Sequence, residues 1–226
     1  MPHNTLRGTP LNHPLTRDRL NDGLVFWWKG LPGLTEGEYA YDLTPFKNHG
    51  QLTNMDPNVA WVDDPRGGRA LDFDGSDDHV VGPTLTVPIT VMAWFRYRGS
   101  GNRRIWQFGA NRNSANVDSS HRLVGYYNGT TLGLFTGVAA NVWHLAAVSY
   151  DGTNGHVYLD NRVRLSAVAS VYGGAEQLLI GSTTGAPNQI FDGQISDVRI
   201  YNRALPPTEV KDVYLDSLNG YARTLR

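Results

Sequence analysis

Short runs of apolar or alternating residues, separated by turn residues, make up the chain from Leu24 onward. Successive side chains of a strand point to opposite faces, so alternating apolar and polar residues indicate a strand with one buried face. Asn128-Gly129 and Asp151-Gly152 lie between such runs and favour tight hairpin turns, because these residues tolerate positive φ. The pattern predicts an all-β protein with strands at residues 24–29, 49–54, 69–74, 79–82, 89–98, 103–109, 121–127, 131–136, 142–150, 155–164, 177–182 and 189–202.

One segment near the C-terminus has the periodicity of an amphipathic helix instead. Val210, Val213 and Tyr214 recur at helical spacing after Pro206-Pro207, and Gly220 follows as a stop. The many short strands at near-regular spacing are typical of a sandwich or barrel. We therefore expect one short helix packed on the edge of a sandwich.

The two ends of the chain lack this pattern. Residues 1–23 are polar and rich in Pro, Arg and Asn, and residues 219–226 form a short basic tail. These features divide the chain into an extended N-terminal arm (1–23), a sandwich domain (24–218) and a C-terminal tail (219–226). A terminus is usually ordered only where something holds it, so an arm of this kind needs a partner to become ordered. We expect the arm to join protein subunits of an oligomeric assembly.

The composition excludes several classes of function. The 226 residues include no cysteine, which excludes disulfide frameworks, iron–sulfur clusters and cysteine nucleophiles. A formal net charge of −1 argues against a general nucleic-acid binder, which would be basic. The N-terminal residues contain no apolar core of a signal peptide, and no run approaches the ~18 apolar residues of a membrane-spanning helix. We expect neither nucleic acid nor membrane among the partners.

Several segments, taken in order, match the motifs of one superfamily. They include DGQISDVRIYNRAL at 192–205, WHLAAVSYDG at 143–152, TVMAWF at 90–95 and ALDFDG at 70–75. Over about residues 24–218, the chain resembles the laminin-G-like, concanavalin A-like jelly-roll superfamily. The resemblance implies two antiparallel sheets packed face to face. Lectin-like carbohydrate binders, adhesion modules, glucanases and viral surface proteins share this fold, so the fold alone does not select a function.

The resemblance also implies a structural calcium ion, which takes carboxylate and carbonyl oxygens as ligands. Asp197 matches the ligand position on the last long strand, and Asp42 and Asn48 match the opening turn. The alternative is that Asp42 and Asn48 make only turn hydrogen bonds while Asp197 pairs with an arginine. Residues 72–78 (DFDGSDD) also resemble a calcium loop, but they lack the spacing and terminal Glu of an EF-hand, which favours a hairpin turn.

Catalytic and zinc-binding patterns are missing from the sequence. Glycoside hydrolysis commonly uses two carboxylates that flank the bond, and glucanases of this fold carry them as E-x-D-x-x-E on one strand. Such a motif includes none of the glutamates of this chain, which are Glu36, Glu38, Glu176 and Glu209. The 7 histidines stand singly, without the spacing of zinc ligands. We expect a protein that is not an enzyme.

Aromatic platforms and amide side chains are the residue types that would bind a glycan. Residues 111–116 are polar and are interpreted as a loop of the kind that carries function. The alternative is that Trp106 and one of two adjacent tyrosines are core residues, since neighbouring strand residues face opposite ways, and that Asn128 is a turn residue. The candidate glycan-binding residues are Trp106, Asn111, Asn113, Tyr126, Tyr127 and Asn128.

A local cluster of arginines is the candidate protein interface. Arginine is favoured at interfaces, and a cluster across one hairpin could meet an acidic partner surface. The alternative is a solvated face of the sheet. The cluster comprises Arg96, Arg98, Arg103, Arg104 and Arg112.

Two functional hypotheses follow. The first is a non-enzymatic structural protein, a bacteriophage virion surface subunit such as a decoration, fibre-base or capsid-associated protein. It would be made in the bacterial cytoplasm without a signal peptide. The alternative is an extracellular, lectin-like carbohydrate-binding module that serves adhesion or recognition of host glycans.

Overall fold

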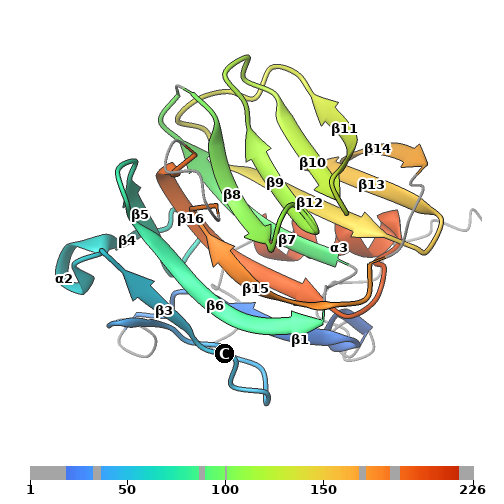
Figure 1. Cartoon of the computed structure of the whole chain (residues 1–226). Helices are drawn as coiled ribbons and strands as arrows, with labels where there is room; N and C mark the ends of the chain where they lie inside the picture. The colour runs from blue at the N-terminus through green and yellow to red at the C-terminus, as the bar shows by residue number, and fades with distance from the viewer. Residues whose placement is uncertain are drawn as a thin grey trace, which may run out of the picture.

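Two antiparallel eight-stranded sheets pack face to face, as the resemblance implies (Figure 1). The computed structural model describes residues 19–32, 37–86, 90–99, 101–167, 172–183 and 189–218. In spatial order, sheet A contains β14 (Arg162–Ala167), β13 (Asn154–Leu159), β12 (His144–Tyr150), β7 (Thr90–Tyr97), β16 (Asp192–Tyr201), β5 (Arg69–Asp74) and β4 (Trp61–Asp63), and β1 (Leu24–Trp28) also pairs with β16. Sheet B contains β11 (Thr130–Phe135), β10 (Leu123–Tyr127), β9 (Asn113–Val117), β8 (Arg103–Phe108), β15 (Ala175–Ile180), β6 (His79–Thr86), β3 (Gly50–Thr53) and β2 (Tyr39–Ala40).

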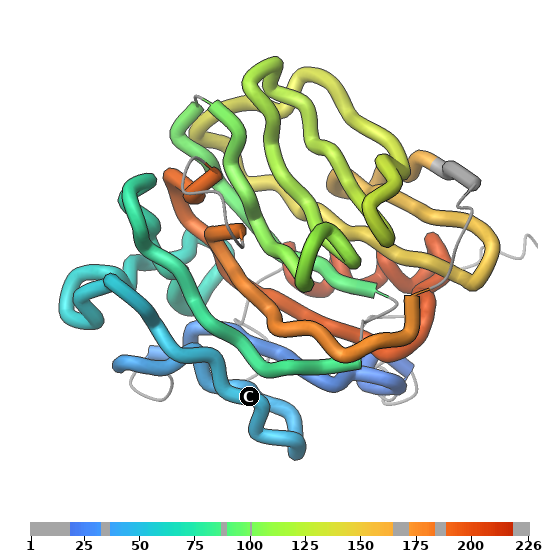
Figure 2. The backbone as a smooth tube through the Cα atoms, in the orientation of Figure 1, coloured from blue at the N-terminus to red at the C-terminus, as the bar shows by residue number. Residues whose placement is uncertain are grey.

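The main hydrophobic core lies between the two sheets, and the alternation of each strand decides which side chains enter it. In β1, Phe26 and Trp28 are fully buried in this core, so Trp27 between them projects to the outer face of sheet A. In β16, Val198 and Ile200 enter the same core. The chain therefore brings its N-terminal and C-terminal strands side by side on sheet A (Figure 2).

A second apolar cluster covers the outer face of sheet A. Helix α3 (Pro207–Leu218) contributes Val210 and Val213, which pack with Trp94 of β7. The indole Nε1 of Trp94 donates a hydrogen bond to Ser217 Oγ at 2.8 Å. The helix was expected at the edge of the sandwich, but it lies on this face, because β7 carries apolar residues on both of its faces and both must be covered.

Two local expectations need correction, and three short elements were not predicted. Residues 113–117 form strand β9 and are not part of a loop. Asp160, at φ +56°, turns the predicted single strand 155–164 into β13 and β14. The very short strands β2 and β4 and the one-turn helix α2 (Pro57–Ala60) have too few residues to show a period.

The N-terminal boundary of the folded domain also differs from the prediction. Leu20 is buried in the second apolar cluster, and Arg19 pairs with Asp212 of α3. Residues 19–23 therefore belong to the packed domain. Residues 1–18 and 219–226, the rest of the predicted arm and tail, lie outside the described residues. Among the helices of the described ranges, none has the length and apolar character that a membrane span requires.

Candidate functional site

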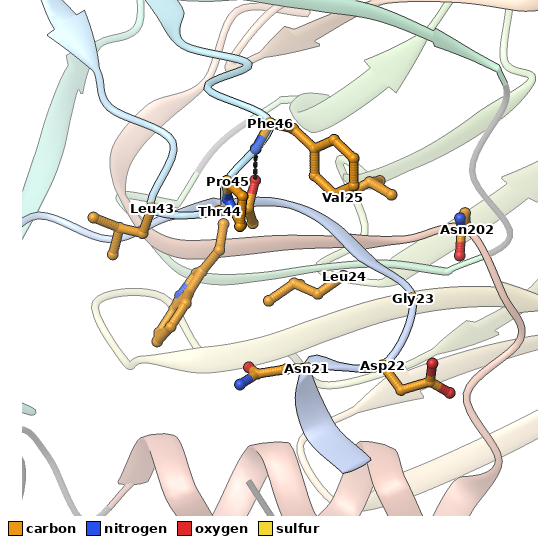
Figure 3. A pocket seen from close by; sticks show the side chains of 11 residues that line it. Asn21, Asp22, Gly23, Leu24, Val25, Leu43, Thr44, Pro45, Phe46 and Asn202 are labelled. Carbon is orange, nitrogen blue, oxygen red and sulfur yellow. Dashed lines mark hydrogen bonds between the residues drawn. The ribbon is translucent and has the colours of Figure 1, made fainter. Parts of the chain in front are cut away.

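A cleft of about 700 Å³ lies beside β1 (Figure 3). Its walls come from three segments that are distant in sequence. The pairing of Leu24 with Tyr201 brings the start of β1 next to the end of β16. The hydrogen bond from the Leu43 amide to the Trp27 carbonyl, 2.8 Å long, holds the third segment against β1. This β1 cleft is lined by Asn21, Asp22, Gly23, Leu24, Val25, Trp27, Leu43, Thr44, Pro45, Phe46 and Asn202.

The β1 cleft combines an aromatic surface with a small number of polar groups. Phe46 is 63% exposed, which is unusual for a large apolar side chain. The exposed amides of Asn21 and Asn202 lie on the same cleft. Asp22 supplies the one carboxylate in this lining, and its Oδ2 lies 3.2 Å from Arg203 Nε. No sequence motif marks these residues, because strand pairing and loop packing bring them together.

The opening-turn residues predicted to bind calcium form a hydrogen-bonded turn. Asp42 Oδ1 accepts hydrogen bonds from the amides of Trp27 (3.0 Å) and Thr44 (2.9 Å). Its Oδ2 accepts from Thr44 Oγ1 (2.7 Å) and the Asn48 amide (2.8 Å). The Asn48 side chain donates to the Val25 carbonyl at 3.0 Å. Each carboxylate oxygen of Asp42 thus accepts two hydrogen bonds. This geometry favours the alternative in which Asp42 and Asn48 make turn hydrogen bonds.

Asp197, the third predicted calcium ligand, pairs with an arginine. It sits at φ +48° on a bulge of β16 and is 4% exposed. Its Oδ1 lies 2.8 Å from Arg199 Nε and 2.8 Å from Trp27 Nε1. Burial alone would raise the pKa of Asp197, but the charges of Arg199 and Lys29 outweigh it and lower the pKa to about 2. This geometry again favours the alternative, in which Asp197 pairs with an arginine.

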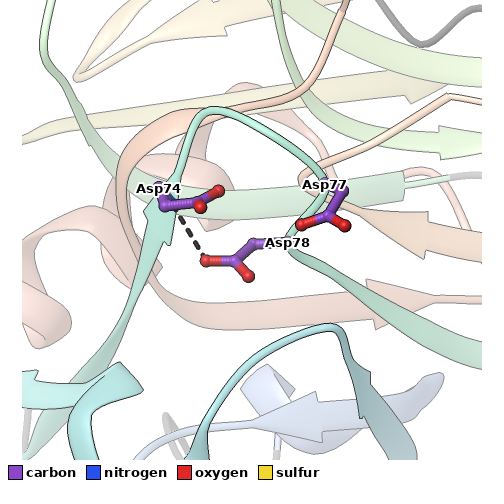
Figure 4. A group of neighbouring side chains, drawn as sticks. All are labelled: Asp74, Asp77 and Asp78. Atoms are coloured by element: carbon purple, nitrogen blue, oxygen red, sulfur yellow. Dashed lines mark hydrogen bonds between the residues drawn. The ribbon is translucent and has the colours of Figure 1, made fainter.

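Residues 72–78 contain the one group of three carboxylates in the described ranges whose oxygen atoms lie within 4.8 Å of one another (Figure 4). The group consists of Asp74, Asp77 and Asp78 at the hairpin between β5 and β6. Asp78 Oδ2 accepts a hydrogen bond from the Asp74 amide at 2.9 Å, and Asp74 Oδ1 accepts from the Ser76 amide at 2.8 Å. The segment is therefore a hydrogen-bonded hairpin turn, as its sequence favours.

Three of the predicted glycan-binding residues are core residues. Trp106, Asn113 and Tyr127 are at most 1% exposed, so none of them is available to a ligand at the surface. Trp106 Nε1 donates to Asn113 Oδ1 at 3.1 Å, and Tyr127 stacks on Tyr150 with 4.4 Å between ring centroids. This confirms the alternative in which Trp106 and one of the two tyrosines are buried.

The other three predicted glycan-binding residues are partly exposed. Asn111 and Asn128 are turn residues with φ of 59° and 45°. The Asn128 side chain accepts a hydrogen bond from Arg112, so its carbonyl oxygen is engaged within the chain. Tyr126 lies on the outer face of sheet B, since its neighbour Tyr127 enters the core. A role for these three in glycan binding stays a prediction.

The arginine cluster does not span one hairpin. Because β7 belongs to sheet A and β8 to sheet B, the connection between them crosses from one sheet to the other. Arg96 Nη1 donates to Gln194 Oε1 at 3.2 Å, and Arg98 forms an ion pair with Asp72. Arg96 of β7 and Arg98, which follows that strand, are thus held by partners within sheet A.

The remaining arginines of the cluster have different surroundings. Arg103 Nη2 lies 3.9 Å from Asp192 Oδ2, and Arg112 Nε lies 3.8 Å from Glu176 Oε1. Arg104 is 4% exposed and is not part of a solvated face. The prediction that all five arginines form a protein interface is therefore wrong in including Arg104. For the partly exposed arginines it stays a prediction.

Solved structures share this fold at low sequence identity. A Trypanosoma rangeli sialidase in complex with sialic acid has a TM-score of 0.67 and 15% identity over 88% of this chain, which spans 34% of the sialidase. Domain 4 of AbnA, an extracellular arabinanase from Geobacillus stearothermophilus, in complex with arabinotriose, has a TM-score of 0.64 and 20% identity, covering 84% of this chain and 98% of that domain. The binding domain of Paraclostridial Mosquitocidal Protein 1 has a TM-score of 0.66 and 13% identity, with 86% and 52% covered.

The family comparison agrees with the architecture. No curated protein matches the chain. A family model described as the concanavalin A-like lectin/glucanases superfamily matches residues 74–211. These residues run from the end of β5 into α3 and include most of both sheets. With the two-sheet sandwich described above, this match shows that the chain belongs to the concanavalin A-like lectin/glucanase superfamily.

Proposed function

We propose that the chain is a non-catalytic, lectin-like module that binds a glycan in the β1 cleft. The observation that carries the proposal is the exposed Phe46 ring on the same cleft as the amides of Asn21 and Asn202. A sugar ring has apolar C–H faces and a rim of hydroxyl groups. An exposed aromatic ring can stack on the apolar face, and side-chain amides can form hydrogen bonds with the hydroxyl groups.

The relatives support a binding role. The arabinanase domain of the same fold has arabinotriose bound, and the toxin segment is described as a binding domain. The β1 cleft also lacks the chemistry of hydrolysis, because its lining offers one carboxylate, Asp22, which already pairs with Arg203. Glycoside hydrolysis commonly needs two carboxylates on either side of the bond.

A glycan array followed by calorimetry with arabinotriose and with each array hit tests the proposal. Phe46→Ala should weaken binding about fivefold to tenfold, since an aromatic stacking contact contributes about 1 kcal/mol. Val59→Ala is the matched control, because Val59 is also exposed but lies on α2, outside the cleft lining. A silent array, or equal affinity of the wild type and Phe46→Ala, contradicts the proposal.

The virion assignment stays a prediction, together with its location on a virion surface. It depends on subunit contacts through residues 1–18, which lie outside the described residues. Size-exclusion chromatography of the chain with and without residues 1–18 tests it. An arm that joins subunits predicts an oligomer that truncation converts to monomer, whereas a monomer in both samples argues against it.

A further inference from the structure

Two arginines are almost completely buried in the described part of the chain, and only one of them has a carboxylate partner. Arg104 and Arg199 are each 4% exposed. Arg199 pairs with Asp197 at 2.8 Å. The hydrogen bonds of Arg104 go instead to neutral oxygens, from Nη1 to Ser114 Oγ at 3.1 Å and from Nη2 to Gln189 Oε1 at 2.6 Å.

Arg104 lies on the outer face of sheet B. Its neighbour Ile105 enters the core between the sheets, whereas Arg104 is outside that core. The register of β8 and β9 places Asn116 directly opposite Arg104. Within the described ranges, Arg104 Nε and Asn116 Oδ1 are both buried and both lack a hydrogen-bond partner. A donor and an acceptor are thus left open on two directly paired residues.

The charge of Arg104 is also uncompensated by any described acid. Burial lowers the pKa of Arg104 to about 10, and the phenol of Tyr126 is the other ionisable group that acts on it. The Tyr126 ring centroid lies 5.7 Å from Arg104 Cζ. The guanidinium therefore keeps its proton at neutral pH. A buried charge is costly unless an opposite charge compensates it, so this position attracts an anionic group.

We propose that Arg104 and Asn116 form a subsite for a hydroxylated carboxylate, such as a sugar acid. The carboxylate accepts hydrogen bonds from the guanidinium, and a hydroxyl of the same ligand donates to Asn116 Oδ1. Hydrogen bonds between two charged groups are about twice as strong as neutral ones, so the carboxylate would compete well with the neutral oxygen of Gln189. The hydroxyl is required because a carboxylate oxygen cannot donate to the amide oxygen of Asn116.

The subsite is covered in this structure, because Arg104 and Asn116 are each 4% exposed, and a ligand reaches it by displacing the Gln189 side chain. It is independent of the β1 cleft. Tyr126 and Gln189, which lie against the guanidinium, are both partly exposed. Arg104, Asn116 and Tyr126 belong to the neighbouring strands β8, β9 and β10 of sheet B (Figure 1). The β1 cleft is built around a strand of sheet A. The inference therefore goes beyond the proposed function and does not rest on it.

Three probes separate the two chemical requirements. Thermal unfolding of the full chain is followed with D-glucuronate, glucose or acetate at constant ionic strength, since a ligand that binds the folded state raises Tm. D-Glucuronate carries the carboxylate and hydroxyls, glucose only hydroxyls, and acetate only the carboxylate. We expect a concentration-dependent rise of Tm with glucuronate that exceeds the rise with either partial probe.

Two variants and one control assign the effect to the subsite. Arg104→Gln should weaken glucuronate binding at least about tenfold. Asn116→Asp retains Arg104 but places a carboxylate opposite it, so it should raise Tm and abolish the glucuronate shift. The control is Arg96→Gln, because Arg96 also donates to neutral oxygens, those of Asn141 and Gln194, but is partly exposed.

Specific outcomes overturn the proposal. They are the absence of a glucuronate shift in the wild type, an equal shift with acetate, or an undiminished shift in Asn116→Asp. If Arg104→Gln does not fold, Asn116→Asp still decides the matter. Val59→Ala, outside both the β1 cleft and the subsite, should leave the glucuronate shift unchanged. The subsite is tested through Arg104→Gln and Asn116→Asp and the β1 cleft through Phe46→Ala with the array hits, so their failures are observed separately.

Discussion

The indole Nε1 of Trp27 donates a hydrogen bond to Asp197 Oδ1 at 2.8 Å. The backbone amide of the same residue donates to Asp42 Oδ1 at 3.0 Å. Trp27 thus contacts both carboxylates that the family resemblance offers as calcium ligands, one through its side chain and the other through its main chain. The two aspartates have otherwise different partners, the opening turn for Asp42 and Arg199 for Asp197, and each makes a distinct prediction.

Replacing Asp197 should expose the cost of an unpaired buried arginine. Asp197→Asn keeps the shape of the side chain, and asparagine tolerates the φ of +48° at this position. It leaves Arg199 buried without its counter-charge, so we expect a loss of about 3–5 kcal/mol in the free energy of unfolding. Urea denaturation measures the loss. The double variant Asp197→Asn with Arg199→Met should recover part of it, and no recovery would contradict the ion-pair explanation.

The same ion pair predicts a pH dependence. The pKa of Asp197 is lowered from 3.8 to about 2, so its folded state binds fewer protons than its unfolded state between these values. The stabilisation is complete above pH of about 4 and is lost as pH falls through about 2. The difference in unfolding free energy between the wild type and Asp197→Asn should therefore shrink with acid. A difference that is constant from pH 7 to pH 2 would contradict the assignment.

Asp42 should stabilise the opening turn in the absence of calcium. Asp42→Asn removes the charge and replaces one acceptor oxygen by a donor, which disrupts bonds from the Thr44 hydroxyl and nearby amides. We expect a loss of about 1–3 kcal/mol that is the same in millimolar calcium and in EDTA. The wild-type Tm should not respond to EDTA. A fall of the wild-type Tm in EDTA that Asp42→Asn abolishes would instead support the calcium ligand set.

The sequence pattern predicted those features that depend only on neighbouring residues. The Asn128-Gly129 hairpin forms because both residues adopt the positive φ that the turn requires. Strand β9 was missed because its sequence, NSANV, is polar, yet Asn113 and Ser114 are fully buried. Their polarity is satisfied by Trp106 and Arg104, which come from the neighbouring strand β8.

The β1 cleft could not be predicted for a related reason. Asn21 and Asn202 line the same cleft because β1 pairs with β16 across most of the chain length. The exposure of Phe46 depends on the loop that Asp42 and Asn48 organise. Periodicity reports which face of an element is buried, but it does not report which distant elements become neighbours.

Arg66 provides a test of the outer face of sheet A. Its Cζ lies 4.0 Å from the ring centroid of Trp94 and 4.5 Å from that of Trp143, and its Nε donates to Asp64 Oδ1 at 3.0 Å. Arg66→Lys keeps the charge but loses the planar group that stacks and bonds at once. We expect a loss of about 1–2 kcal/mol by urea denaturation. Arg162→Lys, at an exposed site, should change stability by less than about 0.5 kcal/mol.

The acidic hairpin predicts a stabilising substitution. Burial, together with the charges of Asp74 and Asp77, raises the pKa of Asp78 above 3.8. A raised carboxyl pKa means that the ionised form of Asp78 destabilises the folded state. The contribution of Asp78 to the free energy of unfolding is therefore lost as pH rises through the pKa of the folded state. Asp77→Asn removes one exposed like charge and should raise the free energy of unfolding at pH 7 by a few tenths of a kcal/mol.

The gain from Asp77→Asn should be smaller at pH 2 than at pH 7, because acid protonates Asp78, whose pKa is raised, and removes the charge that Asp77 repels. Thermal unfolding at the two pH values measures the effect, and Glu38→Gln, at another exposed acid, should show no comparable gain. The measurement is made with EDTA and repeated in calcium. If the hairpin instead binds calcium through Asp74, Asp77 and Asp78, calcium will raise the wild-type Tm and Asp77→Asn will remove that rise, which would contradict repulsion as the dominant effect at this turn.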